Sequence, residues 1–170
     1  NAFYSKGQSP KNMTDEEWEF GIDGTLSSVF RCIREIIPYF KEVNKGKIIN
    51  VSSMYGVVAP EFEVYNSYQQ FLNPPHYGIA KAGVIQLTKY LSSFLSPHGI
   101  RANCISPGAF PFKEISTQYP EFNQRLCDKN PLGRIGEPDD LKGVTALLCT
   151  DLSQYITGQN ICVDGGWAVW

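Results

Sequence analysis

The stretch GKIINVSS, residues 46–53, decides the fold of this chain. After its first glycine it is a short run of apolar and β-branched residues, which is typical of a strand buried on both faces. Two comparable runs follow it, IRANCIS at 100–106 and QNICVDGG at 159–166. If helices connect these three runs, they are the strands of a parallel sheet.

A segment with helical periodicity precedes the first run. From Thr14 to about Lys41 the apolar residues recur at steps of three and four, which predicts a helix with one buried face. Thr14 followed by Glu17 matches a capping box at the start of this helix. The residues expected on the buried face are Trp18, Ile22, Leu26, Phe30, Ile33 and Ile37.

Two further helices stand between the strands. We expect one from Tyr77 to about Leu95 and another from Pro138 to Leu148. Residues 110–136 follow no single period, which predicts a loop with a short helix. Strands that alternate with helices of this length specify parallel pairing through right-handed crossovers. The sequence therefore predicts an α/β fold, a Rossmann-like doubly wound parallel sheet of three strands with flanking helices.

Composition favours one compact domain that acts on a small molecule. The chain has 170 residues and a formal net charge of −2, with acidic and basic residues interspersed. This charge pattern offers no basic surface to nucleic acid or to an anionic membrane. No run approaches the length of a membrane span, and no signal peptide opens the chain. We expect a cytoplasmic protein that binds neither nucleic acid nor membrane.

Cysteine and histidine usage predicts no metal site. His76 and His98 lie beside prolines in expected loops, and neither has a Cys or His neighbour at metal-ligand spacing. The cysteines are odd in number, widely spaced and mostly set among apolar residues, so we interpret them as reduced core residues. They are Cys32, Cys104, Cys127, Cys149 and Cys162.

Three side chains that could transfer a proton follow the first strand. Tyr77 and Lys81 are one helical turn apart and therefore lie on the same helix face. A nearby ammonium lowers the pKa of an acidic neighbour by about 1 to 3 units, which would bring a phenol towards acid–base use. Ser53 could hydrogen-bond the same substrate oxygen, or it could merely cap the strand end. Such a trio would move a proton, whereas a hydride requires a nicotinamide cofactor.

The turn after the second strand could hold that cofactor. Pro107 fixes one backbone torsion and Gly108 has no side chain, so a flat ring and its carboxamide could approach the main chain. A plain turn is the alternative, as it is for VDGG at 163–166. In a doubly wound sheet, ligands bind beyond the carboxyl ends of the strands, where all these residues are expected.

Taken in order, the motifs resemble those of the short-chain dehydrogenase/reductase family, of the compact type. They are NA at the start, GKIINVSS, YGIAK, IRANCISPGAF, GRIGEPDDL and YITGQNICVDGG, and they span essentially the whole chain. The resemblance implies an alcohol dehydrogenase or ketone reductase that uses NAD or NADP. It implies that Tyr77 is the general acid/base, that Lys81 is its electrostatic partner and a ribose ligand, and that Ser53 orients the substrate oxygen. The implied cofactor contacts are Asn1, Ala2, Tyr77, Lys81, Pro107, Gly108 and Phe110.

The sequence departs from the family's pattern in several places. The glycine-rich phosphate loop is absent, so we expect residues 1–170 to be a single domain that lacks its amino-terminal strands and helices. Thr25 stands where the family usually has an asparagine that supports a water beside the lysine, and we take it as the stand-in. Phe112 stands where the family commonly has a threonine that contacts the carboxamide.

The loop before Tyr77 is longer than is usual in the family. Insertions above a site usually shape substrate access, and this one, PEFEVYNSYQQFLNPPH at 60–76, is rich in aromatic and polar residues. It favours a polyol or sugar-like substrate, with a solvated surface loop or an oligomer contact as the alternative. The residues suited to a hydroxyl-bearing ligand are Tyr65, Asn66, Tyr68, Gln69, Gln70 and Asn73.

Two other functions stay open on the sequence. Epimerases and dehydratases of the extended family share Tyr-x-x-x-Lys but carry a larger substrate domain, and this chain ends soon after VDGG. A degenerate member could act as a non-catalytic oligomeric binding or scaffold protein. The helices expected at 14–41 and 77–96 carry more apolar residues than one sheet face can cover, and the resemblance implies pairing through them, so we expect a homodimer or homotetramer.

Overall fold

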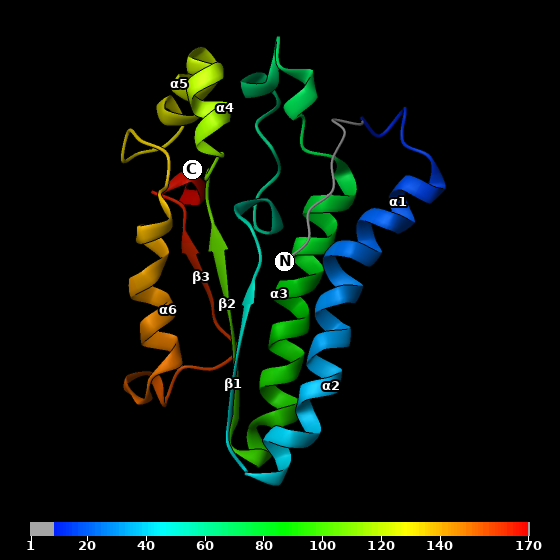
Figure 1. Ribbon diagram of the computed structural model, residues 1–170, viewed down its shortest axis with the longest axis vertical. Helices are drawn as coiled ribbons and strands as arrows, with labels where there is room; N and C mark the ends of the chain where they lie inside the picture. The colour runs from blue at the N-terminus through cyan, green and yellow to red at the C-terminus, as the bar shows by residue number, and fades with distance from the viewer. Residues whose placement is uncertain (1–8, 170) are drawn as a thin grey trace.

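The computed structural model describes residues 9–169, in which strands alternate with helices as the sequence predicts. The strands β1 (Gly46–Val51), β2 (Ile100–Pro107) and β3 (Asn160–Val163) form one parallel sheet in the order β1-β2-β3 (Figure 1). All three carboxyl ends lie at the same end of the sheet (Figure 1). The α/β class and the Rossmann-like parallel sheet are therefore confirmed.

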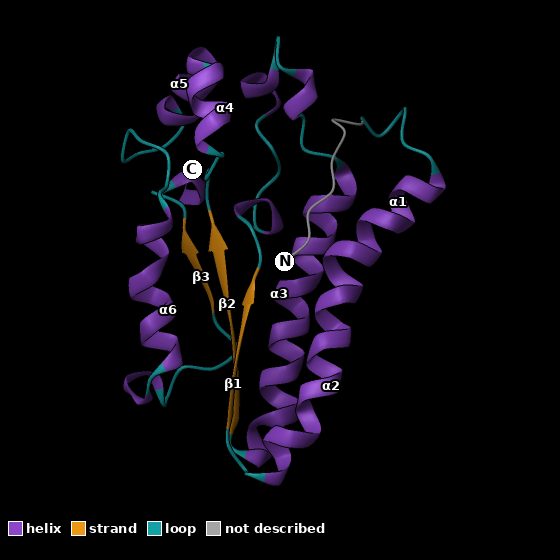
Figure 2. Ribbon diagram, viewed as in Figure 1, coloured by secondary structure: helices purple, strands orange, loops and turns teal. Residues whose placement is uncertain are grey.

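Helices cover both faces of this sheet. On one side lie α1 (Asp15–Ile22), α2 (Ser28–Glu42) and α3 (Pro75–Leu95), and on the other lies α6 (Lys142–Cys149) (Figure 2). The core between α2, α3 and the sheet consists of aliphatic side chains. Its buried members are Ile33, Ile48, Leu91, Leu95, Ile100 and Ala102.

The first predicted helix begins as expected and then changes its winding. Thr14 Oγ1 accepts from the Glu17 amide at 3.2 Å, and Glu17 Oε2 accepts from the Thr14 amide at 3.1 Å, so the capping box is confirmed. Between α1 and α2, residues Asp23–Ser27 form a π-helical turn that the sequence did not predict. A wider turn shifts the faces of the helix beyond it. Phe30, expected to be buried, is 49% exposed.

The segment between β2 and α6 is more helical than predicted. Instead of a loop with one short helix, it contains α4 (Lys113–Gln118) and α5 (Pro120–Asp128), which stand above the carboxyl ends of the strands (Figure 1). A second core joins these helices to the long loop at 54–74. Its buried members are Met54, Tyr55, Val64, Tyr65, Leu72, Ala109, Phe122, Leu126 and Trp167.

The interpretation of the cysteines and histidines needs two corrections. All five cysteines are free, but only Cys104 is buried, whereas Cys32, Cys149 and Cys162 are exposed. Apolar neighbours in sequence did not bury them, because on a helix or an edge strand adjacent residues point in different directions. His76 does not lie in a loop, since it is buried in the first turn of α3. None of the helices in residues 9–169 is long and apolar enough to cross a membrane.

Candidate active site

Ser53 is held where β1 gives way to a short 3₁₀ turn. Its Oγ accepts from the Tyr55 amide at 3.2 Å, so the serine does cap the strand end. The same hydroxyl group is hydrogen-bonded to the Tyr77 side chain at the start of α3. The preceding Ser52 Oγ donates to the Lys81 carbonyl at 2.7 Å and ties the end of β1 to α3. Capping and contact with Tyr77 are therefore compatible roles of one serine.

Lys81 lies beneath the tyrosine, as the helical spacing predicts. Its side chain is buried, its Nζ donates to the Val51 carbonyl at 2.9 Å, and Nζ lies 5.6 Å from the centroid of the Tyr77 ring. Burial lowers the pKa of Lys81 to about 8, because the ammonium loses hydration that the protein only partly replaces. Ser53, Tyr77 and Lys81 are thus brought together at one rim of the sheet.

The predicted lowering of the Tyr77 pKa is wrong for this structure. Burial raises the pKa of Tyr77 above its ordinary value, and the hydrogen bond with Ser53 opposes that rise. Removing the phenolate from water costs more free energy than its interactions with the nearby groups recover. The Tyr77 phenol is therefore protonated at neutral pH, which suits it to donate a proton to a carbonyl oxygen.

A cleft of about 460 Å³ opens in front of these residues. Its lining is divided in chemistry between two parts of the chain. The end of β1, the loop at 54–74 and the start of α3 supply its polar side chains, which are Ser53, Tyr55, Tyr65, Gln70, Asn73 and Tyr77. The segment after β2, through α4 and α5, supplies mainly apolar ones, which are Phe110, Phe112, Ile115, Phe122 and Leu126.

The long loop contributes to this cleft through only some of the residues expected there. Tyr65, Gln70 and Asn73 line it, as predicted. Tyr68 instead packs against Phe122, with ring centroids 5.3 Å apart, and its hydroxyl donates to Glu121 at 3.2 Å. The remaining two, Asn66 and Gln69, are exposed and do not line the cleft. Sequence reasoning missed Tyr55, although its position two residues after Ser53 was a signal that could have found it.

The turn after β2 is shaped by packing against VDGG. Gly108 N donates to the Val163 carbonyl at 3.0 Å, and a Cβ on Gly108 would lie 2.6 Å from the Asp164 Cα. Only glycine allows this close approach. Pro107 is the last residue of β2 and pairs with Val163, so it belongs to the strand itself. Gly108 and Phe110 also line the cleft that holds Tyr77.

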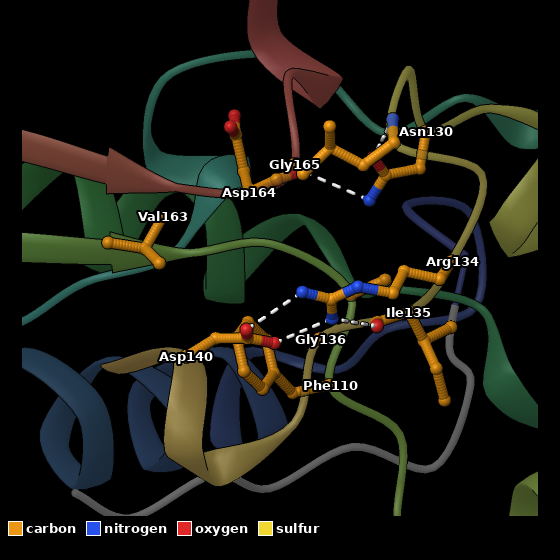
Figure 3. Close-up of a pocket in the computed structure, with 11 residues that line it drawn as sticks. Phe110, Asn130, Arg134, Ile135, Gly136, Asp140, Val163, Asp164 and Gly165 are labelled. Carbon is orange, nitrogen blue, oxygen red and sulfur yellow. Dashed lines mark hydrogen bonds and ion pairs between the residues drawn. The ribbon is translucent and has the colours of Figure 1, made fainter. Parts of the chain in front are cut away.

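Part of the GRIGEPDDL motif lines a smaller cavity of about 150 Å³ beside that turn (Figure 3). Arg134 makes an ion pair with Asp140, with Nη1 2.7 Å from Oδ2, and Asn130 Nδ2 donates to the Asp164 carbonyl at 3.1 Å. In Figure 3 the Phe110 side chain lies beside Gly136. The motif thus supports the loop behind the cleft.

The remaining predicted site residues have different outcomes. Thr25 is buried in the π-helical turn, and that turn contacts α3, the helix that carries Lys81. Asn1 and Ala2 lie outside the residues that the structure describes. Within residues 9–169, no group of three or more His, Cys, Asp or Glu side chains is placed to hold a metal ion.

Comparison with known proteins identifies the family. Residues 1–168 match the family model described as "Enoyl-(Acyl carrier protein) reductase". The chain belongs to the short-chain dehydrogenase/reductase family. The match covers the six motifs quoted above almost completely, so their order is a property of the family and not a coincidence of composition.

Individual relatives support the assignment. The 3-oxoacyl-[acyl-carrier-protein] reductase FabG of Staphylococcus epidermidis is 33% identical over 98% of this chain, which spans 64% of that relative. A short-chain dehydrogenase from Leptospira borgpetersenii, solved with bound NAD+, superposes with a TM-score of 0.87 at 37% identity, covering 98% of this chain and 62% of that one. A gluconate 5-dehydrogenase from Burkholderia cenocepacia, solved with NADP and tartrate, superposes with a TM-score of 0.86 at 26% identity. That match covers 100% of this chain and 63% of the dehydrogenase. The chain therefore spans less than two thirds of these relatives.

The residues present fit the nicotinamide end of such a cofactor. The main chain at 108–110 lines the same cleft as Ser53 and Tyr77, and Gly108 has no side chain to keep a planar ring away. Lys81 supplies a buried amino group directly behind the tyrosine.

Proposed function

We propose that the protein containing this chain is an oxidoreductase that transfers a hydride between NAD or NADP and a secondary alcohol or ketone. The observation that carries the proposal is the convergence of Ser53, Tyr77 and Lys81 at the rim of a cleft. Membership of the short-chain dehydrogenase/reductase family and the bound NAD+ and NADP of two relatives support it.

Each residue has one task in the proposed reaction. In ketone reduction the protonated Tyr77 donates its proton to the carbonyl oxygen, and Ser53 holds that oxygen by a hydrogen bond. The Lys81 side chain lies behind the ring, where a positive charge stabilises the phenolate that forms. The nicotinamide cofactor, when bound, supplies the hydride. In alcohol oxidation the same groups act in reverse, and Tyr77 accepts the proton.

We further propose that the substrate carries at least one hydroxyl group besides the reacting oxygen, a feature that polyols and sugar-like compounds share with simpler hydroxy ketones. Tyr65, Gln70 and Asn73 give the cleft polar groups besides those of the proposed catalytic residues. The gluconate 5-dehydrogenase relative, with its bound tartrate, is a family member whose ligand bears hydroxyls. A site that hydrogen-bonds hydroxyls rejects analogues without them, because its own polar groups would be left unpaired.

The test of this function is the substitution Tyr77→Phe in the full-length protein. It should lower kcat by about 10² to 10⁴, the usual contribution of general acid–base catalysis, with little change in cofactor affinity. Turnover is measured with NADH and NADPH on a panel of ketones.

Tyr155→Phe is the control, because Tyr155 is fully exposed and does not line the cleft. It should leave turnover unchanged. If Tyr77→Phe retains activity within about threefold of the parent, the proposed role of the phenol is wrong. A parent that binds cofactor and assembles but reduces no ketone would favour the scaffold alternative.

A further inference from the structure

Two buried tyrosines beside the proposed catalytic residues share a single hydrogen bond. The hydroxyl oxygens of Tyr55 and Tyr65 lie 2.7 Å apart, and both side chains line the cleft. Each phenol has one proton, so the pair has two. Only one proton can occupy the bond between them, whichever oxygen donates it. The second proton therefore needs another acceptor.

The amide of Asn73 completes this cluster and brings an unused acceptor. Asn73 is hydrogen-bonded to the Tyr65 hydroxyl, while its own Oδ1 is buried without a hydrogen-bond partner in the part of the chain that the structure describes. As the amide is placed, its NH₂ group donates to Tyr65, so Asn73 Oδ1 remains unpaired and the second phenol proton finds no acceptor in Asn73. Turning the amide over would pair that proton with Oδ1 and leave the NH₂ group at the unpaired position instead. In either orientation, Asn73 has a polar group that residues 9–169 leave unpaired.

A hydroxyl group can pair with Asn73 in either orientation of the amide, because a hydroxyl both donates and accepts hydrogen bonds. Buried polar groups in proteins are normally paired, and an unpaired one beside a ligand cleft is often completed by the ligand. Asn73, Tyr55 and Tyr65 line the same cleft as Ser53 and Tyr77. A hydroxyl bound there would belong to the same molecule as the reacting carbonyl, but to a different carbon atom.

The apolar part of the cleft limits how many further hydroxyl groups that molecule can have. Phe110, Ile115 and Phe122 offer no hydrogen bonds, and Leu126 adds further hydrocarbon. A sugar with a hydroxyl on every carbon would leave several of them unpaired against these side chains, which costs free energy. A mainly hydrocarbon frame packs against them favourably.

We propose that Asn73, with Tyr55 and Tyr65, binds a second hydroxyl of the substrate, and that the substrate is a hydroxy ketone, or the matching diol, on a mainly hydrocarbon frame. The inference rests on the proposed function for the identity of the reacting group. The hydroxyl site itself can be tested without turnover.

The experiment compares the binding of 4-hydroxycyclohexanone and cyclohexanone, which differ by one hydroxyl. The full-length Tyr77→Phe protein is loaded with NADH or NADPH, so that the ketones bind without being reduced, and each is titrated by calorimetry. We expect the hydroxy ketone to bind about tenfold more tightly, since one well-made hydrogen bond contributes on that scale. Asn73→Leu in the same background should abolish the preference and change the Kd of cyclohexanone by less than about threefold.

Asn66→Leu is the control, because it makes the same chemical change in the same loop at an exposed position outside the cleft. It should keep the preference. If Asn73→Leu does not fold, Asn73→Ala removes the amide without adding bulk and must lose the same preference.

The outcomes separate the two proposals. Equal binding of the two ketones, or equal weakening of both by Asn73→Leu, overturns the hydroxyl site and leaves the proposed reaction standing. A preference that depends on Asn73 in a protein whose turnover does not depend on Tyr77 supports the hydroxyl site and overturns the proposed role of the phenol.

Discussion

His76 precedes the proposed proton donor and is buried in an unusual way. Its side chain is fully covered, and within residues 9–169 neither ring nitrogen has a hydrogen-bond partner. The ring packs against Gly21 of α1, where an added Cβ would overlap it. Burial lowers the pKa of His76, and the charge of Glu17 opposes that shift only in part. The fold therefore holds a neutral imidazole between α1 and α3.

This arrangement predicts a pH-dependent stability. The unfolded imidazole has a pKa of about 6.5, and the folded one is lower, so near and below this value the unfolded state binds more protons. The contribution of neutral His76 to folding is complete above about pH 6.5 and is lost as the pH falls towards the folded pKa. Thermal unfolding of the full-length protein should show a Tm that declines below about pH 6.5.

His76→Phe, which keeps a ring but cannot be protonated, should flatten that part of the profile. A decline of the same size in the parent and in His76→Phe would show that other groups cause it. Repeating the Tm measurements at high salt helps to exclude surface carboxylates as the cause of the decline. Salt screens their interactions, whereas it does not change the burial of an imidazole.

At the scale of elements, the long loop is fastened to α5. Phe122 is buried and meets three aromatic rings of the loop, with centroid distances of 6.0 Å to Tyr65, 5.3 Å to Tyr68 and 4.9 Å to Phe71. Lys129 and Glu61 add an ion pair at 3.2 Å between the same two elements. The loop and α5 carry the polar and the apolar parts of the cleft lining, so their contact holds the cleft together.

Phe122→Ala should loosen both the fold and the cleft. Removing a buried phenylalanine side chain typically costs about 3 to 5 kcal/mol of unfolding free energy. We also expect faster proteolysis within residues 54–74, because the loop would lose its main apolar contact. Denaturant unfolding and limited proteolysis measure the two effects.

Phe62→Ala serves as the control, since Phe62 belongs to the same loop but is 57% exposed. It should change the unfolding free energy by less than about 0.5 kcal/mol. A loss below about 1 kcal/mol for Phe122→Ala would mean that the aromatic contacts do not anchor the loop.

At the scale of the whole molecule, the outer faces of α2 and α3 expose large apolar side chains. Tyr90 and Phe94 are 62% and 53% exposed and stack on each other with ring centroids 5.8 Å apart. Lys41 of α2 lies 5.2 Å from the centre of the Phe94 ring, so the two helices contribute to one surface. Tyr39 in α2 and Val43, which directly follows α2, are both 66% exposed. Exposed apolar patches of this kind often mark protein interfaces.

We expect the full-length protein to form a homodimer or homotetramer through this surface. Light scattering at micromolar concentration should give the mass of an oligomer. The double substitution Tyr90→Glu and Phe94→Glu should shift the mass towards the monomer, because buried unpaired carboxylates oppose association. A parent that is already monomeric would contradict the prediction. Leu152→Glu, at a position that is 85% exposed in the short turn after α6, is a control that should not alter the mass.

Local patterns in the sequence determined the strands, the capping box of α1 and the spacing that places Tyr77 above Lys81. Each depends on residues a few positions apart, so periodicity and side-chain chemistry are sufficient to predict them. The order of the motifs along the chain also identified the family.

Tertiary structure alone decided the burial and the electrostatics. The π-helical turn, the paired helices α4 and α5, the covered ring of His76 and the raised pKa of Tyr77 depend on which distant elements pack together. Asn73 and Tyr55 are 18 positions apart in sequence and meet at Tyr65 only because the loop folds back over the end of β1. Desolvation and hydrogen-bond satisfaction are properties of a three-dimensional environment, and no local pattern of residue types encodes them.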